Sequence, residues 1–223
     1  MAGDIPDFQP IFTGAFADNY TPGELAMISK LDWMRQKLYQ LAEPCLEWWS
    51  FINRNKIDLK AVEPHCGGVA VALCKSYETV EGDRLFEFSS NGIPCAVIEA
   101  ILFRREGDNI NPYTADLIAW PLNSPDQFAT VLTSGAGCEL LGAWSAFRKD
   151  HTPLTIYQAP LAWLQGGCEG IVLLKPGAEH WLRKAGCPFV CDDTQHGSTI
   201  RELLGPAGRH HKILIPNSER KAA

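Results

Sequence analysis

Six polar side chains in the C-terminal third of the sequence belong to the types that bind ligands or exchange protons. They are Gln158, Lys175, Asp192, Asp193, His196 and Ser198. Carboxylates, imidazoles and amines can act as general acids and bases, and carboxylates also bind metal ions. We assign candidate catalytic roles to Lys175, Asp192, Asp193 and His196, and candidate ligand-binding roles to Gln158 and Ser198. The alternative is that Asp193 or Thr194 caps a following helix and that the other side chains are only solvated.

The segments that carry these residues alternate between short apolar runs and short helical patterns. The runs predict strands over Leu154–Tyr157, Gly170–Leu174, Pro188–Cys191 and Lys212–Ile215. The patterns between them predict helices over Pro160–Gln165, Ala178–Ala185 and Ser198–Leu204. Strands that alternate with helices usually lie parallel, because a crossover between parallel strands needs about a dozen residues. Since the carboxyl ends of parallel strands meet at one edge of a sheet, we expect the six side chains to share that edge.

A metal-dependent phosphoryl-transfer site of the toprim type would place a glutamate after one strand and an Asp-x-Asp pair after a later one. Glu169 instead precedes its strand, and Asp192 and Asp193 are adjacent in the sequence. The pattern therefore does not fit such a site.

A zinc site is the next possibility, because Cys187 and Cys191 are spaced as zinc ligands can be, with His196 as a third ligand. Possible fourth ligands are Cys168, His180 and His210. No second closely spaced ligand pair exists, and Cys191 lies in an apolar run where a cysteine packs as a small hydrophobic residue. We therefore predict no metal site, and the sequence identifies no cofactor.

His65 and Cys66 are a third candidate, since an imidazole can activate a thiol. Sequence neighbours usually point apart when the backbone is extended, so we expect no catalytic pair here. Gly67 and Gly68, which follow, indicate a turn into a strand.

The N-terminal part of the sequence predicts a helical layer. Thr21, Pro22 and Glu24 form a cap, a first-turn proline and a capping box, so a helix should run from Thr21 to near Pro44. A second helical piece over Cys45–Ile52 is apolar on nearly every side. Its apolar residues are Leu46, Trp48, Trp49, Phe51 and Ile52. Such a segment is either buried between layers or offered to a protein partner or a second copy of the chain.

The middle of the sequence is rich in β-strand signals. Strands are predicted over Val69–Cys74, Leu85–Phe88, Cys95–Phe103 and Ala115–Leu122, with a helix over Pro125–Leu132. The third and fourth strands should pair across the polar turn Arg105–Pro112. We expect a mixed α/β fold in one globular unit, residues 1–223. It can be subdivided into a helical layer (1–60), a β-rich part (61–147) and a β/α part (154–216).

Composition excludes several functional classes. The net charge of −6 gives no field that attracts nucleic acid, so we expect no nucleic-acid partner. No apolar run approaches the roughly 20 residues of a membrane span, and the N-terminus lacks a basic, apolar signal sequence. The eight cysteines lack the spacing of a disulfide framework, which favours a reducing compartment. We expect a soluble, cytoplasmic protein.

No reaction-defining motif remains after these tests, so two functions are open. The first is a non-catalytic interaction or assembly protein. The short tryptophan-containing helices suggest an accessory protein of a bacterial or phage system. The alternative is a small-molecule or phosphate-handling enzyme with its site at the carboxyl ends of the C-terminal strands.

Overall fold

The computed structural model describes residues 22–41, 46–106, 109–133, 137–146, 152–185, 187–206 and 211–216. The helical layer consists of α1 (Pro22–Leu41), α2 (Leu46–Arg54) and α3 (Leu59–Cys66). The predicted Thr21 cap lies outside the described residues. Along α1, the side chains of Leu31, Met34 and Leu38 recur at intervals of three and four and are buried, as the helical period requires.

Helix α3 was not predicted from the sequence, since Pro64 interrupts the helical pattern. Its ends nevertheless carry regular capping groups. Asp58 accepts a hydrogen bond from the backbone N–H of Lys60, and Gly67 ends the helix with a φ of 64°. A left-handed conformation of this kind favours glycine, because a Cβ atom would be strained there.

The β-rich middle forms a closed barrel with the strand order β1-β2-β5-β4-β3. Its strands are β1 (Val69–Glu78), β2 (Arg84–Phe88), β3 (Ile93–Glu106), β4 (Asn109–Pro121) and β5 (Ala129–Thr130). The predicted antiparallel pairing of the third and fourth strands is confirmed. The ladder extends further than expected, because Glu106 still pairs with Asn109 within the predicted turn.

The helix predicted over Pro125–Leu132 is wrong. Ser124 starts a hydrogen-bonded turn, in which its carbonyl accepts from the N–H of Gln127. The chain then enters β5, which pairs with β4 on one side and with β2 on the other. Local capping residues were overridden because these two pairings close the barrel.

The C-terminal α/β unit contains a five-stranded sheet with the order β10-β9-β7-β8-β6. Its elements are β6 (Leu140–Leu141), α4 (Ala143–Ala146), β7 (Leu154–Tyr157), α5 (Pro160–Gln165), β8 (Ile171–Leu173), α6 (Glu179–Lys184), β9 (Phe189–Cys191), α7 (Thr194–Leu204) and β10 (Ile213–Leu214). Strands β7, β8, β9 and β10 are parallel, as predicted, whereas β6 pairs antiparallel with β8 at the sheet edge. The predicted mixed α/β fold, with its N-terminal helical layer, is confirmed.

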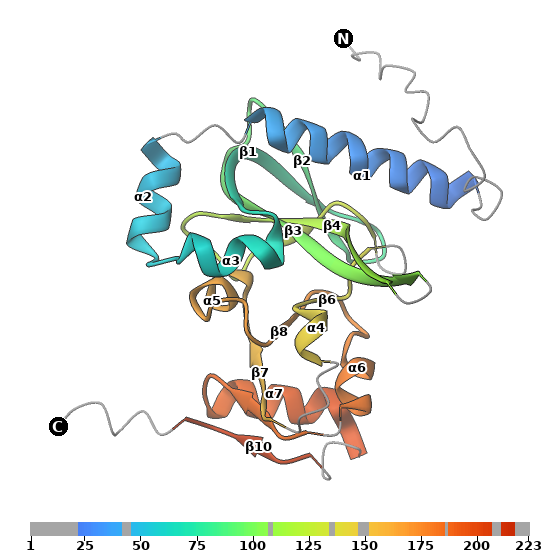
Figure 1. Ribbon diagram of the computed structural model, residues 1–223, viewed down its shortest axis with the longest axis vertical. Helices are drawn as coiled ribbons and strands as arrows, with labels where there is room; N and C mark the ends of the chain where they lie inside the picture. Colours follow the sequence, from blue (N-terminus) through green and yellow to red (C-terminus); the bar gives the residue numbers. More distant parts are fainter. Residues whose placement is uncertain are drawn as a thin grey trace.

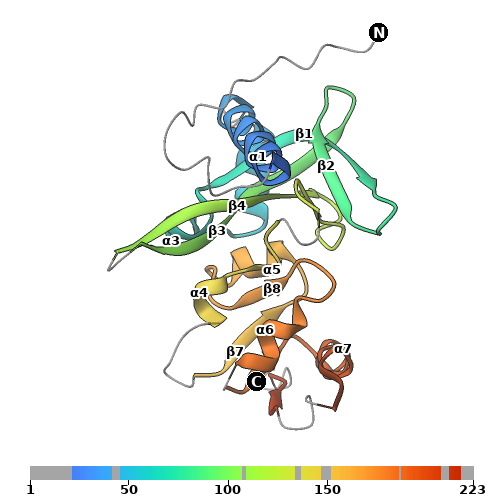
Figure 2. The ribbon, with the colours of Figure 1, turned by 90° about the vertical axis from the view of Figure 1, so that its right-hand side faces the viewer.

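The barrel with its helices forms one half of the molecule and the α/β unit forms the other (Figures 1 and 2). A single apolar cluster spans both halves. It joins Ile98, Ile118 and Trp120 of the barrel strands to Trp163 and Val172 of the α/β unit. The opposite face of the barrel strands packs in a separate cluster against α1.

Two further properties concern the described residues as a whole. None of their helices is both long and apolar enough to cross a bilayer. Six of their cysteines are buried free thiols, namely Cys66, Cys74, Cys95, Cys138, Cys168 and Cys191, and Cys187 is partly exposed.

Candidate functional site

The predicted site residues follow the ends of three neighbouring parallel strands. Gln158 follows β7, Lys175 lies two residues after β8, and Asp192 and Asp193 follow β9. In the strand order, β7 lies between β9 and β8. The topology therefore assigns these four positions to one edge of the sheet, while their side chains make different contacts.

Asp192, Asp193 and His196 meet at the start of α7. Asp193 is the N-cap residue, and its Oδ1 accepts a 2.7 Å hydrogen bond from the N–H of His196. The Nδ1 atom of His196 lies 3.5 Å from Oδ2 of Asp192. Burial lowers the pKa of His196, although the carboxylates of Asp192 and Asp193 oppose this effect. The capping part of the alternative is confirmed, whereas its other part is wrong for Lys175 and His196, because both are buried rather than solvated.

The two predicted ligand-binding residues lie nearby in the fold. Ser198 is exposed on α7 and donates a 2.9 Å hydrogen bond to the carbonyl of Thr194. Gln158 is exposed at the end of β7, the strand that pairs with β9. Mg²⁺ in proteins is usually held by one or two carboxylates together with water, and the carboxylates at this edge come from the end of β9. Gln158 offers only a neutral amide beside Asp192.

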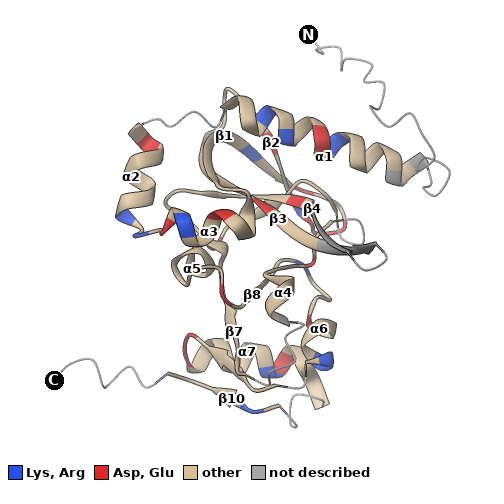
Figure 3. Cartoon of the chain, in the orientation of Figure 1, with Lys and Arg blue, Asp and Glu red and all other residues tan. Residues whose placement is uncertain are grey.

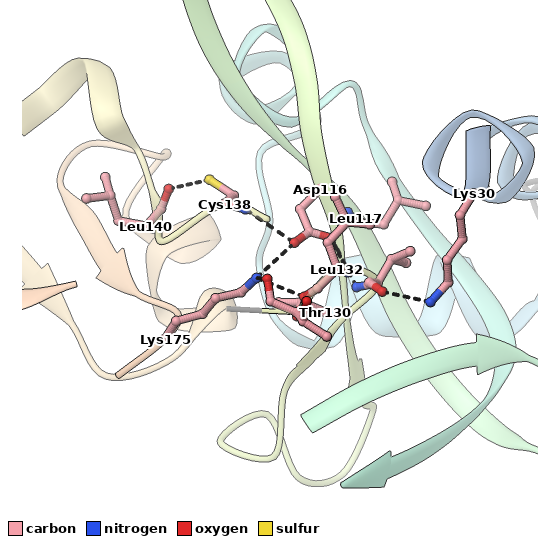
Figure 4. Close-up of polar contacts among 10 residues, drawn as sticks. Lys30, Asp116, Leu117, Thr130, Leu132, Cys138, Leu140 and Lys175 are labelled. Atoms are coloured by element: carbon pink, nitrogen blue, oxygen red, sulfur yellow. Dashed lines mark hydrogen bonds and ion pairs between the residues drawn. The ribbon is translucent and has the colours of Figure 1, made fainter. Parts of the chain in front are cut away.

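Lys175 points into the interior between the two halves of the molecule (Figure 4). Its Nζ donates hydrogen bonds of 2.8 Å and 2.9 Å to the carbonyls of Leu132 and Thr133. It also lies 3.5 Å from Oδ2 of Asp116, and the two side chains are only 3% and 0% exposed. The contacts of Lys175 and His196 are therefore separate, with Asp116 and Asp192 as their respective partners.

Asp116, on β4, has a complete set of hydrogen-bond donors. Its Oδ1 accepts from the N–H groups of Leu117, Val131 and Leu132, and its Oδ2 from that of Cys138. Burial raises the pKa of Asp116 to about 6, although Lys175 and the N–H donors act in the opposite direction. Sequence reasoning missed this residue. Its signal was a single carboxylate within an apolar strand, since a buried charge requires a partner.

A crevice of about 240 Å³ lies beside this network, between the barrel and the segment after β8. Two of its lining residues form an ion pair, in which a guanidinium nitrogen of Arg84 lies 3.1 Å from Oε1 of Glu78. Asp192 and His196 are not among the described residues that line it. Lys175 does line it, so the crevice includes one of the predicted site residues but neither Asp192 nor His196.

Two candidate sites contain cysteines, the possible zinc ligands and the pair of His65 and Cys66, and in the described residues neither forms a site. Among the described residues, no three side chains of the types His, Cys, Asp and Glu form a group that could hold a metal ion. The ring of His65 stacks on Trp144 at a centroid distance of 4.9 Å. The thiol of Cys66 instead contacts the carbonyl of Val62 inside the core. His65 and Cys66 therefore have different surroundings.

Helix α2 divides the predicted partner-binding residues into two groups. Phe51 and Ile52 are 1% and 4% exposed, so they belong to the core and cannot form a partner surface. Leu46 and Trp49 are 79% and 50% exposed. Trp48 is partly buried. Its indole N–H donates to the carbonyl of Val69, and its ring contacts that of Trp49 edge-on. We call Leu46 and Trp49 the exposed α2 face.

No protein-family model matches the chain, and no curated protein or solved structure matches it either. Its function is therefore inferred from the residues and their geometry.

Proposed function

We propose that this protein is a non-catalytic interaction or assembly protein of a bacterial or phage system. The observation that carries the proposal is the exposed α2 face. Leu46 and Trp49 are 79% and 50% exposed on a nine-residue helix that Phe51 and Ile52 anchor in the core. A large aromatic side chain held on an anchored helix can bury its area against a partner with little loss of conformational freedom.

The contacts at the strand ends support the same proposal. Asp193 caps α7, and Lys175 is buried against Asp116. A reaction at this edge would need an accessible acid and base in reach of a substrate. Lys175 is only 3% exposed and cannot meet that need without leaving its partners.

The partner is a protein or a second copy of the chain, and the location is the cytoplasm. The buried free thiols agree with a reducing compartment. Basic residues of α1 and α3 are interspersed with acidic ones (Figure 3), which does not favour a nucleic-acid surface.

The test replaces Leu46 and Trp49 together by serine. The matched control is Val80→Ser, because Val80 is also a fully exposed apolar residue, at 101%, but lies between β1 and β2. We expect the wild type and the control to self-associate in size-exclusion chromatography with light scattering, or to retain the same partner in a pull-down. The double variant should lose that association. A wild type that is monomeric and captures no partner would remove the support for the proposal.

The alternative is a small-molecule or phosphate-handling enzyme at the carboxyl ends of the strands. One observation favours it: the carboxylate of Asp192 and the imidazole of His196 lie 3.5 Å apart at that edge. Hydrolysis of an aryl phosphate, assayed with and without Mg²⁺, tests it. Activity in the wild type that is lost in Asp192→Asn would establish the enzyme in place of the interaction protein.

A further inference from the structure

Three parts of the molecule hold the short segment Val131–Thr133. Asp116 of the barrel accepts hydrogen bonds from the N–H groups of Val131 and Leu132. Lys175 of the α/β unit donates to the carbonyls of Leu132 and Thr133 (Figure 4). Lys30 of α1 donates to the carbonyl of Val131 at 3.1 Å. The segment therefore touches the helical layer, the barrel and the α/β unit through polar groups.

The ion pair of Asp116 and Lys175 lies where the barrel meets the α/β unit. Among the ion pairs of the described residues, the pair of Asp116 and Lys175 is the one that joins the barrel to the α/β unit. Both side chains are almost completely buried, at 0% and 3% exposed. Removing two charges from water is costly, so such a pair adds little net stability compared with apolar side chains of similar size.

The backbone at Gly137 passes so close to the ion pair that no side chain fits there. A Cβ atom on Gly137 would lie 2.2 Å from Oδ2 of Asp116 and 2.4 Å from Nζ of Lys175. Both distances are far below van der Waals contact, so a larger residue would displace the charged atoms. The next residue, Cys138, supplies one of the N–H donors to Asp116.

Apolar contacts and charged hydrogen bonds contribute differently to docking. The shared core of Trp120, Trp163 and Val172 drives the association of the two halves, but burial of apolar area depends little on direction. A carboxylate and an ammonium with fixed donors and acceptors tolerate only one arrangement, because any shift leaves a buried charge without its partner.

We propose that Asp116 and Lys175 form an orientation lock, which selects one arrangement of the α/β unit on the barrel while the apolar core supplies the affinity. The lock is independent of the proposed partner surface on α2. It also explains why a lysine that follows a parallel strand turns away from the strand ends.

The test compares Asp116→Asn, Lys175→Met and the double variant with the wild type. Each single variant leaves one buried charge unpaired, so its unfolding equilibrium constant should rise by roughly 10²- to 10³-fold. The double variant removes both charges, while the asparagine oxygen can still accept from the N–H groups of Leu117, Val131 and Leu132. Its unfolding constant should fall below those of both single variants but stay above the wild-type value, because the carbonyls of Leu132 and Thr133 lose their donor.

Orientation is read separately, from amide NMR spectra and hydrogen exchange of the double variant. We expect multiple resonances, or at least tenfold faster exchange, for residues 131–133 and 171–174, with the barrel pairs of β3 and β4 unchanged. The matched control removes the exposed pair through Glu78→Gln and Arg84→Met, and should change neither measurement. A double variant with a single, wild-type set of resonances and wild-type exchange would overturn the lock. One that fails to fold would also overturn it, because the pair would then supply docking energy.

Discussion

Charged side chains inside this protein are held by complete sets of partners. Glu99 is 4% exposed and accepts from Arg35 at 3.1 Å and from the hydroxyls of Tyr39 and Thr114. These contacts tie α1 to the barrel, as Asp116 ties the α/β unit to it. A carboxylate with several donors avoids the cost of an unpaired buried charge. At the scale of the residue, buried charged side chains therefore connect secondary-structure elements to one another.

The pH dependence of stability provides a prediction at this scale. Burial keeps the pKa of His196 below its ordinary value of 6.5. At this residue the unfolded state then binds more protons than the folded state as the pH falls through 6.5, so His196 should make the protein less stable on acidification. His65, whose pKa burial also lowers, contributes in the same direction. Asp116, whose pKa burial raises to about 6, acts in the opposite direction.

The measurement is urea unfolding of the wild type and His196→Asn at pH 7.5 and pH 5.5. Asparagine can accept from the N–H of Asp192, as the imidazole Nδ1 does, but does not titrate. The variant should lose less stability between the two pH values. Equal losses in both proteins would show that His196 does not contribute.

At the scale of the element, the short helices depend on their ends. Helix α7 has 11 residues, and in its first turn the N–H of His196 donates to the side chain of Asp193. An isolated helix of this length is marginal in water, so capping and the packing of its buried residues Ile200 and Leu204 determine whether it forms. The candidate catalytic residue His196 thus lies on a helix whose start Asp193 stabilises.

Substitution of the cap is therefore expected to be costly. Asp193→Ala should lower the free energy of unfolding by about 1 kcal/mol, because the N–H of His196 loses its acceptor. Asp193→Asn keeps an acceptor oxygen and should change the stability by only a few tenths of that amount. Chemical denaturation measures both variants, and equal effects of alanine and asparagine would contradict the capping role.

At the scale of the whole molecule, the barrel and the α/β unit share one apolar core. Trp120 from β4 and Trp163 from α5 are 0% and 1% exposed in the same cluster. Neither half can bury these side chains alone. We therefore keep the expectation of a single globular unit, within which the helical layer, the β-rich part and the β/α part are a subdivision.

Unfolding should accordingly be cooperative. Far-ultraviolet circular dichroism, which follows helices in both halves, and tryptophan fluorescence, to which Trp120 and Trp163 of the shared core contribute, should report the same urea midpoint. Leu164→Ala creates a cavity on the α/β side of that core. It should lower the free energy of unfolding by about 2–5 kcal/mol and move the midpoints of both signals together. Two transitions, with only one displaced by the substitution, would show that the halves unfold independently.

The sequence by itself determined the alternating C-terminal elements and their direction. Helix α5 and strand β7 have the predicted bounds, Pro160–Gln165 and Leu154–Tyr157. This was possible because short-range periodicity and crossover length depend on neighbouring residues alone. The apolar stripe of α1 was predictable for the same reason.

Only the tertiary structure decided which contacts these elements make. β5 is a strand because two distant strands pair with it, although its flanking residues favour a helix. Helix α2 carries large apolar residues on both its buried and its exposed side, so only packing determined that Phe51 is buried and Trp49 exposed. Lys175 lies at a predicted strand end, yet its side chain points inward because it pairs with Asp116, which lies on a strand far away in the sequence. Such choices depend on pairwise contacts between remote residues, which a local pattern does not contain.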